Sequence, residues 1–316
     1  MGERALIFLR MLCGLSAVVL ALGCAREPAA PASTTARASE AWPEVLRLGH
    51  APSDETVVDR EKASRVLAKY LERRLGIPVE LVQTASYGPA VDALADGAVD
   101  LVGLTPFAYI LASERGWAEA LVVRGTALNG PRTYRSAIVT HRRTGLARLE
   151  DLSERARHLR FNFTDPASNS GHLVPRARLA GLGLHAKKDF ASTEFVLSHN
   201  VAVLNVEFGL ADVAGVSNTT LQRLLESGLV GRDSLVVLWV SDELPNGPMA
   251  VRADLPGELK RRLREAFLEL PQADPEASRA VMAPYEAGEV YVACDDTLYD
   301  GLRALGRGAA GEGPER

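Results

Sequence analysis

The residues best suited to binding a ligand lie in one short stretch, residues 161–172. An apolar run ends at Phe163, an Asp-Pro turn follows, and the small polar residues Ser168, Asn169 and Ser170 lead into an amphipathic stretch. Hydroxyl and amide donors, with the N–H groups of a first helical turn, can surround a tetrahedral oxyanion without a formal positive charge. The same spacing fits a simple helix cap at Ser170, and the pattern alone leaves both interpretations open.

Residues for catalysis or metal binding show no comparable pattern. The sequence contains no GxSxG, HExxH, P-loop or SxxK motif. Its six histidines are scattered without metal-ligand spacing, so we expect no metal site and no cofactor. Gly306, Gly308 and Gly311 form a GxGxxG pattern, but they follow no predicted strand and open no predicted helix. The residues therefore favour a binding protein over an enzyme.

Composition limits the classes of partner. The chain has 316 residues, of which 47% are hydrophobic and 24% charged, which is typical of a globular chain long enough for two domains. The formal net charge is -4 and no basic stripe is present, so we expect no nucleic-acid partner.

The elements that position the polar cluster alternate between β-rich and amphipathic stretches. Repeated βα alternation predicts an α/β fold with mainly parallel sheets. The predicted strands are residues 45–48, 79–83, 101–104, 121–124, 137–140, 160–163, 195–197, 213–216 and 235–240, and the predicted helices are 60–75, 89–95, 173–182, 201–208, 221–227 and 258–268. In the first helix an apolar face at 3–4 spacing predicts a core contact and not a ligand site.

The N-terminus carries an export signal. Basic residues precede an apolar run of about a dozen residues, and small residues then lead to Cys24. This resembles a lipoprotein signal peptide (1–23) that makes Cys24 the lipidated first residue, and ordinary secretory cleavage remains the alternative. Either interpretation predicts export to the periplasm or cell surface. Residues 24–42 are predicted to be a flexible tether and residues 306–316 a disordered tail.

Several short motifs, taken in order, resemble one protein family. The stretch DPASNSGHLVP (165–175) resembles the DP-x-S-T-S-G-x-L-x-P signature of the periplasmic phosphonate-, phosphite- and phosphate-binding proteins of ABC importers, the PhnD type. Four further passages match in the family's order, at residues 84–87, 97–109, 133–136 and 198–212. The resemblance spans residues 45–270. It implies the two-lobed α/β fold of periplasmic binding proteins (type II-like), with the ligand in the interlobe cleft.

The resemblance assigns a role to the polar cluster. Ser168 and Asn169 match a Ser-Thr pair that binds phosphoryl oxygens, and Asn169 departs from the family's threonine. Ser170 belongs to the same cluster and is expected to contact the ligand. His172 matches a variable position, so we expect it near the site and at the surface.

Residues outside this cluster complete the implied site. Tyr87 and Tyr134 match tyrosines that face the ligand, and Ser136 follows two residues after Tyr134. His199 matches a histidine that opens a helix, where an imidazole N–H can reach the anion.

Two departures narrow the implied ligand. Family members that bind aminoalkylphosphonates use carboxylates to receive the ammonium group, and the matching positions here are Thr219 and Gly247. Neither supplies the negative charge that a desolvated ammonium needs. The resemblance therefore implies phosphate, phosphite or a simple alkylphosphonate.

The resemblance also implies how the chain works. Lobe 1 is predicted to comprise residues 43–133 and 245–305, and lobe 2 residues 134–244, with hinge strands near 130–134 and 238–245. Closure around the ligand would present the protein, expected to be a monomer held to the membrane only by its lipid anchor, to an ABC permease and its ATPase. A sensor or adaptor with a different small ligand, and an exported enzyme, are the alternatives, although the enzyme lacks a recognisable nucleophile–base pair.

Overall fold

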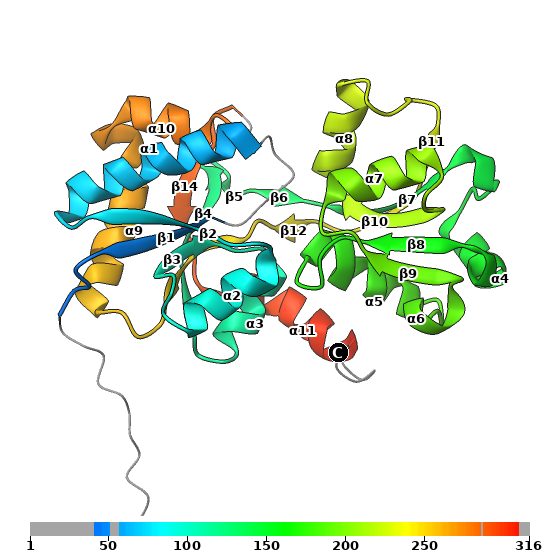
Figure 1. The fold of residues 1–316 in the computed structure, drawn as a ribbon, viewed down its shortest axis with the longest axis horizontal. Helices are drawn as coiled ribbons and strands as arrows, with labels where there is room; N and C mark the ends of the chain where they lie inside the picture. The colour runs from blue at the N-terminus through cyan, green and yellow to red at the C-terminus, as the bar shows by residue number, and fades with distance from the viewer. Residues whose placement is uncertain (1–40, 51–56, 286, 310–316) are drawn as a thin grey trace, which may run out of the picture. The chain divides into compact units, whose positions relative to one another are not determined.

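The structure is a computed structural model that describes residues 41–50, 57–285 and 287–309 (Figure 1). The chain divides into two units, residues 1–37 and 38–316, and the described residues all belong to the second. The predicted signal peptide, Cys24, most of the predicted tether and residues 310–316 lie outside the described residues.

One α/β lobe, called lobe 1, is built on a sheet with the strand order β14-β4-β13-β3-β1-β2, in which β5 also pairs with β4. Its strands are β1 (Leu46–His50), β2 (Val79–Gln83), β3 (Leu101–Gly103), β4 (Ala118–Thr126), β5 (Gly130–Pro131), β13 (Pro248–Arg252) and β14 (Val290–Ala293). Its helices are α1 (Val57–Leu75), α2 (Tyr87–Ala95), α3 (Pro106–Ser113), α9 (Gly257–Ala273), α10 (Pro275–Met282) and α11 (Asp300–Ala309). The apolar face of α1, with Leu67 and Leu71, packs in one core with Leu263 and Phe267 of α9, so its prediction as core is confirmed.

The other lobe, called lobe 2, is built on a sheet with the order β11-β7-β10-β8-β9. Its strands are β7 (Ser136–His141), β8 (Arg160–Phe163), β9 (Ser192–Phe195), β10 (Val213–Ser217) and β11 (Leu235–Val240). Its helices are α4 (Leu152–Arg155), α5 (Val174–Ala180), α6 (Ala186–Asp189), α7 (His199–Phe208) and α8 (Asn218–Glu226). Two hydrophobic clusters belong to this lobe, one with α4, α5 and α6 and the other with α7 and α8.

Both sheets are mixed, which corrects the expectation of mainly parallel pairing. In lobe 1, β1 runs parallel to β2 and β3, whereas β13 and β14 pair antiparallel with β4. In lobe 2, β7 pairs antiparallel with both β10 and β11. β13 and β14 are not among the predicted strands, and both return to lobe 1 antiparallel to β4.

The lobes are joined where two chain crossings pair with each other. β6 (Thr133–Tyr134) leads from lobe 1 to lobe 2, and β12 (Leu244–Pro245) leads back. The two form an antiparallel ribbon, with Leu244 opposite Tyr134 and Pro245 opposite Thr133. The ribbon lies within the two segments in which hinge strands were expected.

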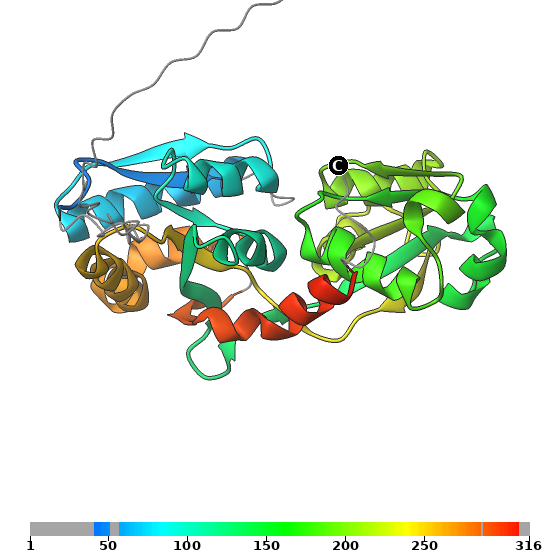
Figure 2. The ribbon, with the colours of Figure 1, turned by 90° about the horizontal axis from the view of Figure 1, so that it is seen from below.

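The C-terminal helix α11 corrects one prediction, the disordered tail from residue 306. Residues 306–309 are helical, because the preceding turn places Leu302 in a buried cluster with Tyr299. That cluster also contains Ala167 and Val174 of lobe 2, and α11 packs against both α3 and α5 (Figure 2). Gly306 and Gly308 thus belong to a packed helix and not to a dinucleotide-binding turn.

Smaller differences concern the ends of elements. The strand expected at 195–197 is β9 and ends at Phe195, because Leu197 has a positive φ of 59° that interrupts extended structure. The helix expected from residue 173 begins earlier, with a π-helical turn, η4 (Asn169–Leu173), that continues into α5. Among residues 41–50, 57–285 and 287–309, no helix is long and apolar enough to span a membrane.

Candidate functional site

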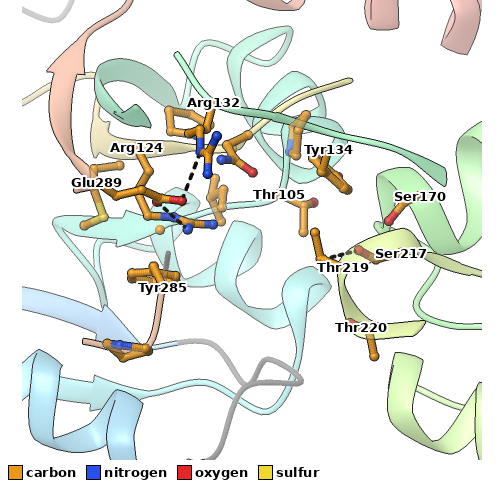
Figure 3. A pocket seen from close by; sticks show the side chains of 18 of the residues that line it. Thr105, Arg124, Arg132, Tyr134, Ser170, Ser217, Thr219, Thr220, Tyr285 and Glu289 are labelled. Carbon is orange, nitrogen blue, oxygen red and sulfur yellow. Dashed lines mark hydrogen bonds and ion pairs between the residues drawn. The ribbon is translucent and has the colours of Figure 1, made fainter. Parts of the chain in front are cut away.

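A cavity of about 750 Å³ is lined by residues of both lobes (Figure 3). Lobe 1 contributes Tyr87 and Thr105, at the starts of α2 and α3. Lobe 2 contributes Ser168 and His199, and Tyr134 comes from the ribbon between the lobes. The structure therefore brings together Tyr87, Tyr134, Ser168, Ser170 and His199, five of the predicted site residues, around one cavity.

Hydroxyl groups line one side of this cavity. The residues, which we call the hydroxyl wall, are Thr105, Tyr134, Ser168, Ser170, Ser217 and Thr219. Figure 3 shows Ser170, Ser217 and Thr219 close together on lobe 2, with Tyr134 and Thr105 next to them. Each hydroxyl can donate one hydrogen bond and accept others. Thr105 already donates to the Ala167 carbonyl, and the hydroxyls that do not donate within the protein offer neutral donors to an oxyanion.

The π-helical turn η4 determines how the serines are presented. Ser168 Oγ accepts the Gly171 N–H at 3.0 Å, and the Ser168 carbonyl accepts the Leu173 N–H at 3.1 Å. A Cβ at residue 171 would lie 1.8 Å from Thr164 Oγ1, so only glycine allows the turn to lie so close to the loop after β8. The helix cap is therefore Ser168 and not Ser170, and the Ser170 side chain points toward the cavity (Figure 3).

Two predicted site residues lie behind the cavity lining. Asn169 is 1% exposed, and its Nδ2 donates to the Tyr134 phenol oxygen at 3.3 Å. Ser136 is fully buried, and its Oγ donates to the Ser170 carbonyl at 2.7 Å. Both side chains thus hold residues of the hydroxyl wall in place and are absent from the lining itself.

Tyr134 is kept in its donor form. Burial raises the pKa of its phenol above the ordinary value of 10.0, and this outweighs the opposing hydrogen bonds from Asn169 and Ser170. The phenol therefore keeps its proton at neutral pH. Since its oxygen already accepts from Asn169, the O–H remains to donate to another group.

His199 stands at the start of α7, after the N-cap Ser198, whose hydroxyl accepts the Val201 N–H at 3.2 Å. His199 Nδ1 accepts the backbone N–H of Ser217 at 2.9 Å. In the neutral ring this bond assigns the proton to Nε2. His199 lines the cavity, so the imidazole adds an N–H donor beside the hydroxyls.

Thr219 and Gly247, the two positions at which the resemblance implies carboxylates in proteins that bind an amine, both line the cavity. Thr219 shares a hydrogen bond of 2.6 Å with Ser217, hydroxyl to hydroxyl. A Cβ at Gly247 would lie 1.7 Å from the Leu104 carbonyl oxygen, so the backbone leaves no room for any side chain there. A negative charge is therefore missing at residue 219 and sterically excluded at residue 247.

A group of charged and aromatic side chains lines another part of the cavity. This group, which we call the arginine wall, consists of Arg124, Arg132, Tyr285 and Glu289 (Figure 3). Glu289 accepts from Arg124 Nη1 at 2.9 Å and from Arg132 Nε at 3.4 Å. The Arg124 guanidinium lies 3.7 Å from the centre of the Tyr285 ring. The Glu289 carboxylate is thus already matched by cations.

His172 is not at the surface, which corrects its prediction. The residue is 4% exposed, and its Nδ1 lies 2.7 Å from the Pro166 carbonyl oxygen. Its ring makes edge contacts with Phe163 and Phe195, at centroid distances of 5.1 and 4.9 Å. These aromatic residues enclose it beneath the turn that carries Ser168. Separately, no group of three or more His, Cys, Asp or Glu residues that could hold a metal ion is found in the part of the chain that the structure describes.

Sequence reasoning missed several lining residues. Thr105 lies in a passage that matches the family and precedes a proline, a pattern typical of a helix N-cap. Its Oγ1 accepts from the Ala108 N–H and donates to the Ala167 carbonyl of lobe 2 at 2.8 Å. Arg124 ends a predicted apolar strand. A single charged residue at the end of such a strand could have been identified as a candidate binding residue. No local pattern points to Glu289, because it meets Arg124 only through the pairing of β14 with β4.

Comparison with known proteins shows which family model the chain matches. Residues 51–299 match the family model described as ABC transporter, phosphonate, periplasmic substrate-binding protein. The chain is 27% identical to the phosphate-import protein PhnD of Mycolicibacterium smegmatis over 249 residues, which are 75% of this chain and 74% of that protein.

Solved structures show the same fold. A binding-protein component of an ABC phosphonate transporter from Pseudomonas aeruginosa is similar with a TM-score of 0.73 and 25% identity, covering 85% of this chain and 87% of that one. PhnD1 of Prochlorococcus marinus, in complex with methylphosphonate, is similar with a TM-score of 0.72 and 19% identity, covering 84% of this chain and 98% of that one. The two-lobed periplasmic-binding-protein fold expected from the sequence is thereby confirmed.

Proposed function

Because the chain belongs to the family of phosphonate-binding periplasmic substrate-binding proteins of ABC transporters, we propose that it captures a small phosphorus oxyanion without an amine. Phosphate, phosphite and simple alkylphosphonates are examples of this class. The family delivers its ligand to a transporter and carries out no reaction on it.

The hydroxyl wall is the observation that carries the proposal. Tyr134, Ser168, Ser170 and the Nε2–H of His199 are neutral donors around one cavity, and Tyr87 adds a phenol from lobe 1. Neutral donors can match each oxygen of a phosphoryl group, so the number of hydrogen bonds and the size of the cavity decide which anion fits. Asn169 and Ser136 support this set from behind.

The absence of an amine in the ligand follows from the charges near the cavity. Thr219 and Gly247 offer no carboxylate, and the Glu289 carboxylate is engaged by Arg124 and Arg132. The other carboxylate of the lining, Glu226, is exposed to solvent and accepts from Gln222. A desolvated ammonium at residues 219 and 247 would therefore lose its hydration without gaining a counter-charge.

Closure would bring the two halves of the site together. Tyr87 belongs to lobe 1, whereas Ser168 and His199 belong to lobe 2, so a ligand that contacts all three favours the closed form by its differential contacts. The ribbon of β6 and β12 is the natural hinge, between a lobe 1 of residues 43–133 and 245–305 and a lobe 2 of residues 134–244. A permease and its ATPase would recognise that closed form.

We further propose a lipid anchor. Cleavage before Cys24 and lipidation of its thiol would tether the folded body to the membrane through residues 24–42. Mass spectrometry of the purified mature protein tests this, because an acylated Cys24 has a diagnostic mass and ordinary secretory cleavage leaves an unmodified chain.

Calorimetry on the purified chain tests the ligand. The protein is unfolded and refolded to strip bound ligand, and is then titrated with phosphate, phosphite, methylphosphonate, 2-aminoethylphosphonate and sulfate. We expect sub-micromolar binding, on the order of −8 kcal/mol or tighter, of one phosphorus oxyanion. Ser168→Ala and His199→Ala should weaken it at least about tenfold by removing donors to a charged group, whereas Ser153→Ala and His158→Ala, outside the cavity lining, should not.

Two outcomes contradict the proposal. Equal affinity for 2-aminoethylphosphonate and methylphosphonate would mean that the ammonium is accommodated. No heat with any phosphorus oxyanion would favour the alternative, a sensor or adaptor of this fold with a different small ligand.

A further inference from the structure

The capture of a simple phosphate does not require the arginine wall. The hydroxyl wall and His199 already offer a full set of donors for one tetrahedral anion, whereas Figure 3 shows Arg124, Arg132 and Glu289 gathered at a separate side of the same cavity. A five-atom anion needs about 150 Å³, counting about 30 Å³ for each water-sized group, and the cavity measures about 750 Å³. The cavity therefore has room for a second ligand group at the arginine wall.

Arg124 is held in one orientation from two directions. Its Nη1 donates to Glu289 Oε2 at 2.9 Å, and the Glu289 side chain is only 4% exposed. The face of its guanidinium stacks on the Tyr285 ring, 3.7 Å from the ring centre. Its backbone carbonyl also accepts the Arg132 N–H at 2.9 Å, which ties the strand to the residue between β5 and β6.

The fixed orientation of Arg124 matters because a guanidinium that stacks on an aromatic ring can hydrogen-bond a ligand only through the N–H groups at its edge. With one face on Tyr285 and one nitrogen on Glu289, the rest of the planar fork is the part that a ligand can reach, and the Arg124 side chain is 24% exposed. A planar fork matches the two oxygens of a carboxylate or of a second phosphoryl group. Because the fork is already oriented, little side-chain entropy is lost on binding.

We propose that the preferred ligand has two anionic groups: a phosphoryl group at the hydroxyl wall and a carboxylate or second phosphoryl group at Arg124. This inference rests on the proposed function and specifies its substrate class. The ligand is an organophosphorus compound whose two acidic groups are separated by a short carbon chain. The phosphoryl group provides binding affinity at the hydroxyl wall, and the second acidic group provides specificity at Arg124.

Two ligands of equal length test the second subsite directly. 3-Phosphonopropionate and propylphosphonate both carry three carbons on phosphorus, but only the first ends in a carboxylate. On the wild-type protein we expect calorimetry to give about tenfold tighter binding of 3-phosphonopropionate, as a charge-assisted contact at a partly buried arginine implies. Methylenediphosphonate reports in the same way on a phosphoryl group in the second position.

A conservative variant assigns the effect to Arg124. Arg124→Lys keeps the charge beside Glu289 but removes the planar fork, so the advantage of 3-phosphonopropionate should fall to about twofold or less while propylphosphonate affinity stays within about twofold. The matched control is Arg115→Lys. Arg115 also lies over an aromatic ring, 5.1 Å from the centre of Trp117, but outside the cavity lining, and its replacement should change neither affinity.

The outcomes separate this inference from the proposed function. If both ligands bind wild type equally well, the second subsite is refuted and phosphorus-oxyanion binding stands; the ligand comparison decides this even if the variant does not fold. If Arg124→Lys keeps the full preference, the second group is bound elsewhere and the assignment is wrong. If no phosphorus compound binds, including phosphate and methylphosphonate, the proposed function fails and this inference fails with it.

Discussion

Among the glycines in the part of the chain that the structure describes, Gly247 has the closest neighbouring atom to a Cβ position. A Cβ there would lie 1.7 Å from the Leu104 carbonyl oxygen and 2.9 Å from the Thr105 Cα, both of them backbone atoms. The two segments are further tied by the Leu104 N–H, which donates to the Pro248 carbonyl at 3.0 Å. We predict that Gly247→Ala lowers the free energy of unfolding by about 1–3 kcal/mol, the usual effect of overpacking, as measured by urea denaturation.

Gly257→Ala is the matched control for that substitution. Gly257 opens α9, has no heavy atom within 4 Å of a Cβ position and has no positive φ, so alanine there should leave stability unchanged or slightly higher. Similar losses for the two variants would show that the contact with Leu104 is not what disfavours a side chain at residue 247.

At the scale of elements, the junction between β9 and α7 carries strain next to the site. Leu197 has a φ of 59°, a left-handed conformation that costs an L side chain roughly 1–2 kcal/mol. Its side chain is 60% exposed, so little burial offsets that cost. We predict that Leu197→Asn raises the free energy of unfolding by about 0.5–1 kcal/mol in urea denaturation, because asparagine tolerates this region.

Leu197→Ala separates backbone strain from the loss of the leucine side chain. Alanine keeps a Cβ and gains no tolerance for positive φ, so it should be no more stable than wild type. The Leu197 N–H donates to the Thr164 carbonyl at 2.9 Å, and this backbone bond does not require the leucine side chain. We therefore expect His199 to keep its place and ligand affinity to stay unchanged in both variants. An equal gain from both substitutions would contradict the strain argument.

The elements show what could be predicted from the sequence and what could not. Periodicity located the strands and helices that have strong apolar patterns, such as α1, and the small polar residues after β8 pointed to Ser168 and Ser170. The burial of the Asn169 side chain behind the cavity lining could not be predicted, because it depends on the π-helical geometry of η4. The arginine wall was missed because Glu289 and Arg124 are 165 residues apart and meet only through sheet pairing.

At the scale of the whole molecule, one hydrophobic cluster is shared by both lobes. It contains Tyr109, Tyr299 and Leu302 of lobe 1 together with Ala167 and Val174 of lobe 2. The rings of Tyr109 and Tyr299 are 4.9 Å apart at their centres, and the Tyr299 hydroxyl donates to the Asn246 carbonyl at 3.1 Å. The cluster therefore couples the lobes to the segment that links them.

This cluster predicts a loss of stability at alkaline pH. Burial raises the pKa of Tyr109 and of Tyr299 above the ordinary value of 10.0. Their contribution to stability is therefore complete below pH 10, and it is lost as the pH rises above 10, because the unfolded chain ionises first. We expect the urea-unfolding free energy to fall by up to about 1.4 kcal/mol per pH unit for each tyrosine.

Tyr299→Phe tests this assignment. The variant loses one hydrogen bond at every pH, but its stability should fall less steeply above pH 10 than that of the parent chain. Both chains should carry Cys294→Ser, because burial also raises the pKa of the Cys294 thiol, to about 11, and its ionisation would overlap. Parallel curves for the two chains would show that Tyr299 does not titrate on unfolding.

The way the chain is shared between the lobes also affects the order in which they can fold. The strands of lobe 2 come from one continuous segment, whereas lobe 1 needs β13, which pairs Ala250 with Val102 only after all of lobe 2 has been made. Closing that long loop is entropically easier when the intervening residues are already compact. Lobe 2, with its serines and His199, can therefore be complete during synthesis or passage across a membrane, while Arg124 and Glu289 can meet only when the last strand has emerged.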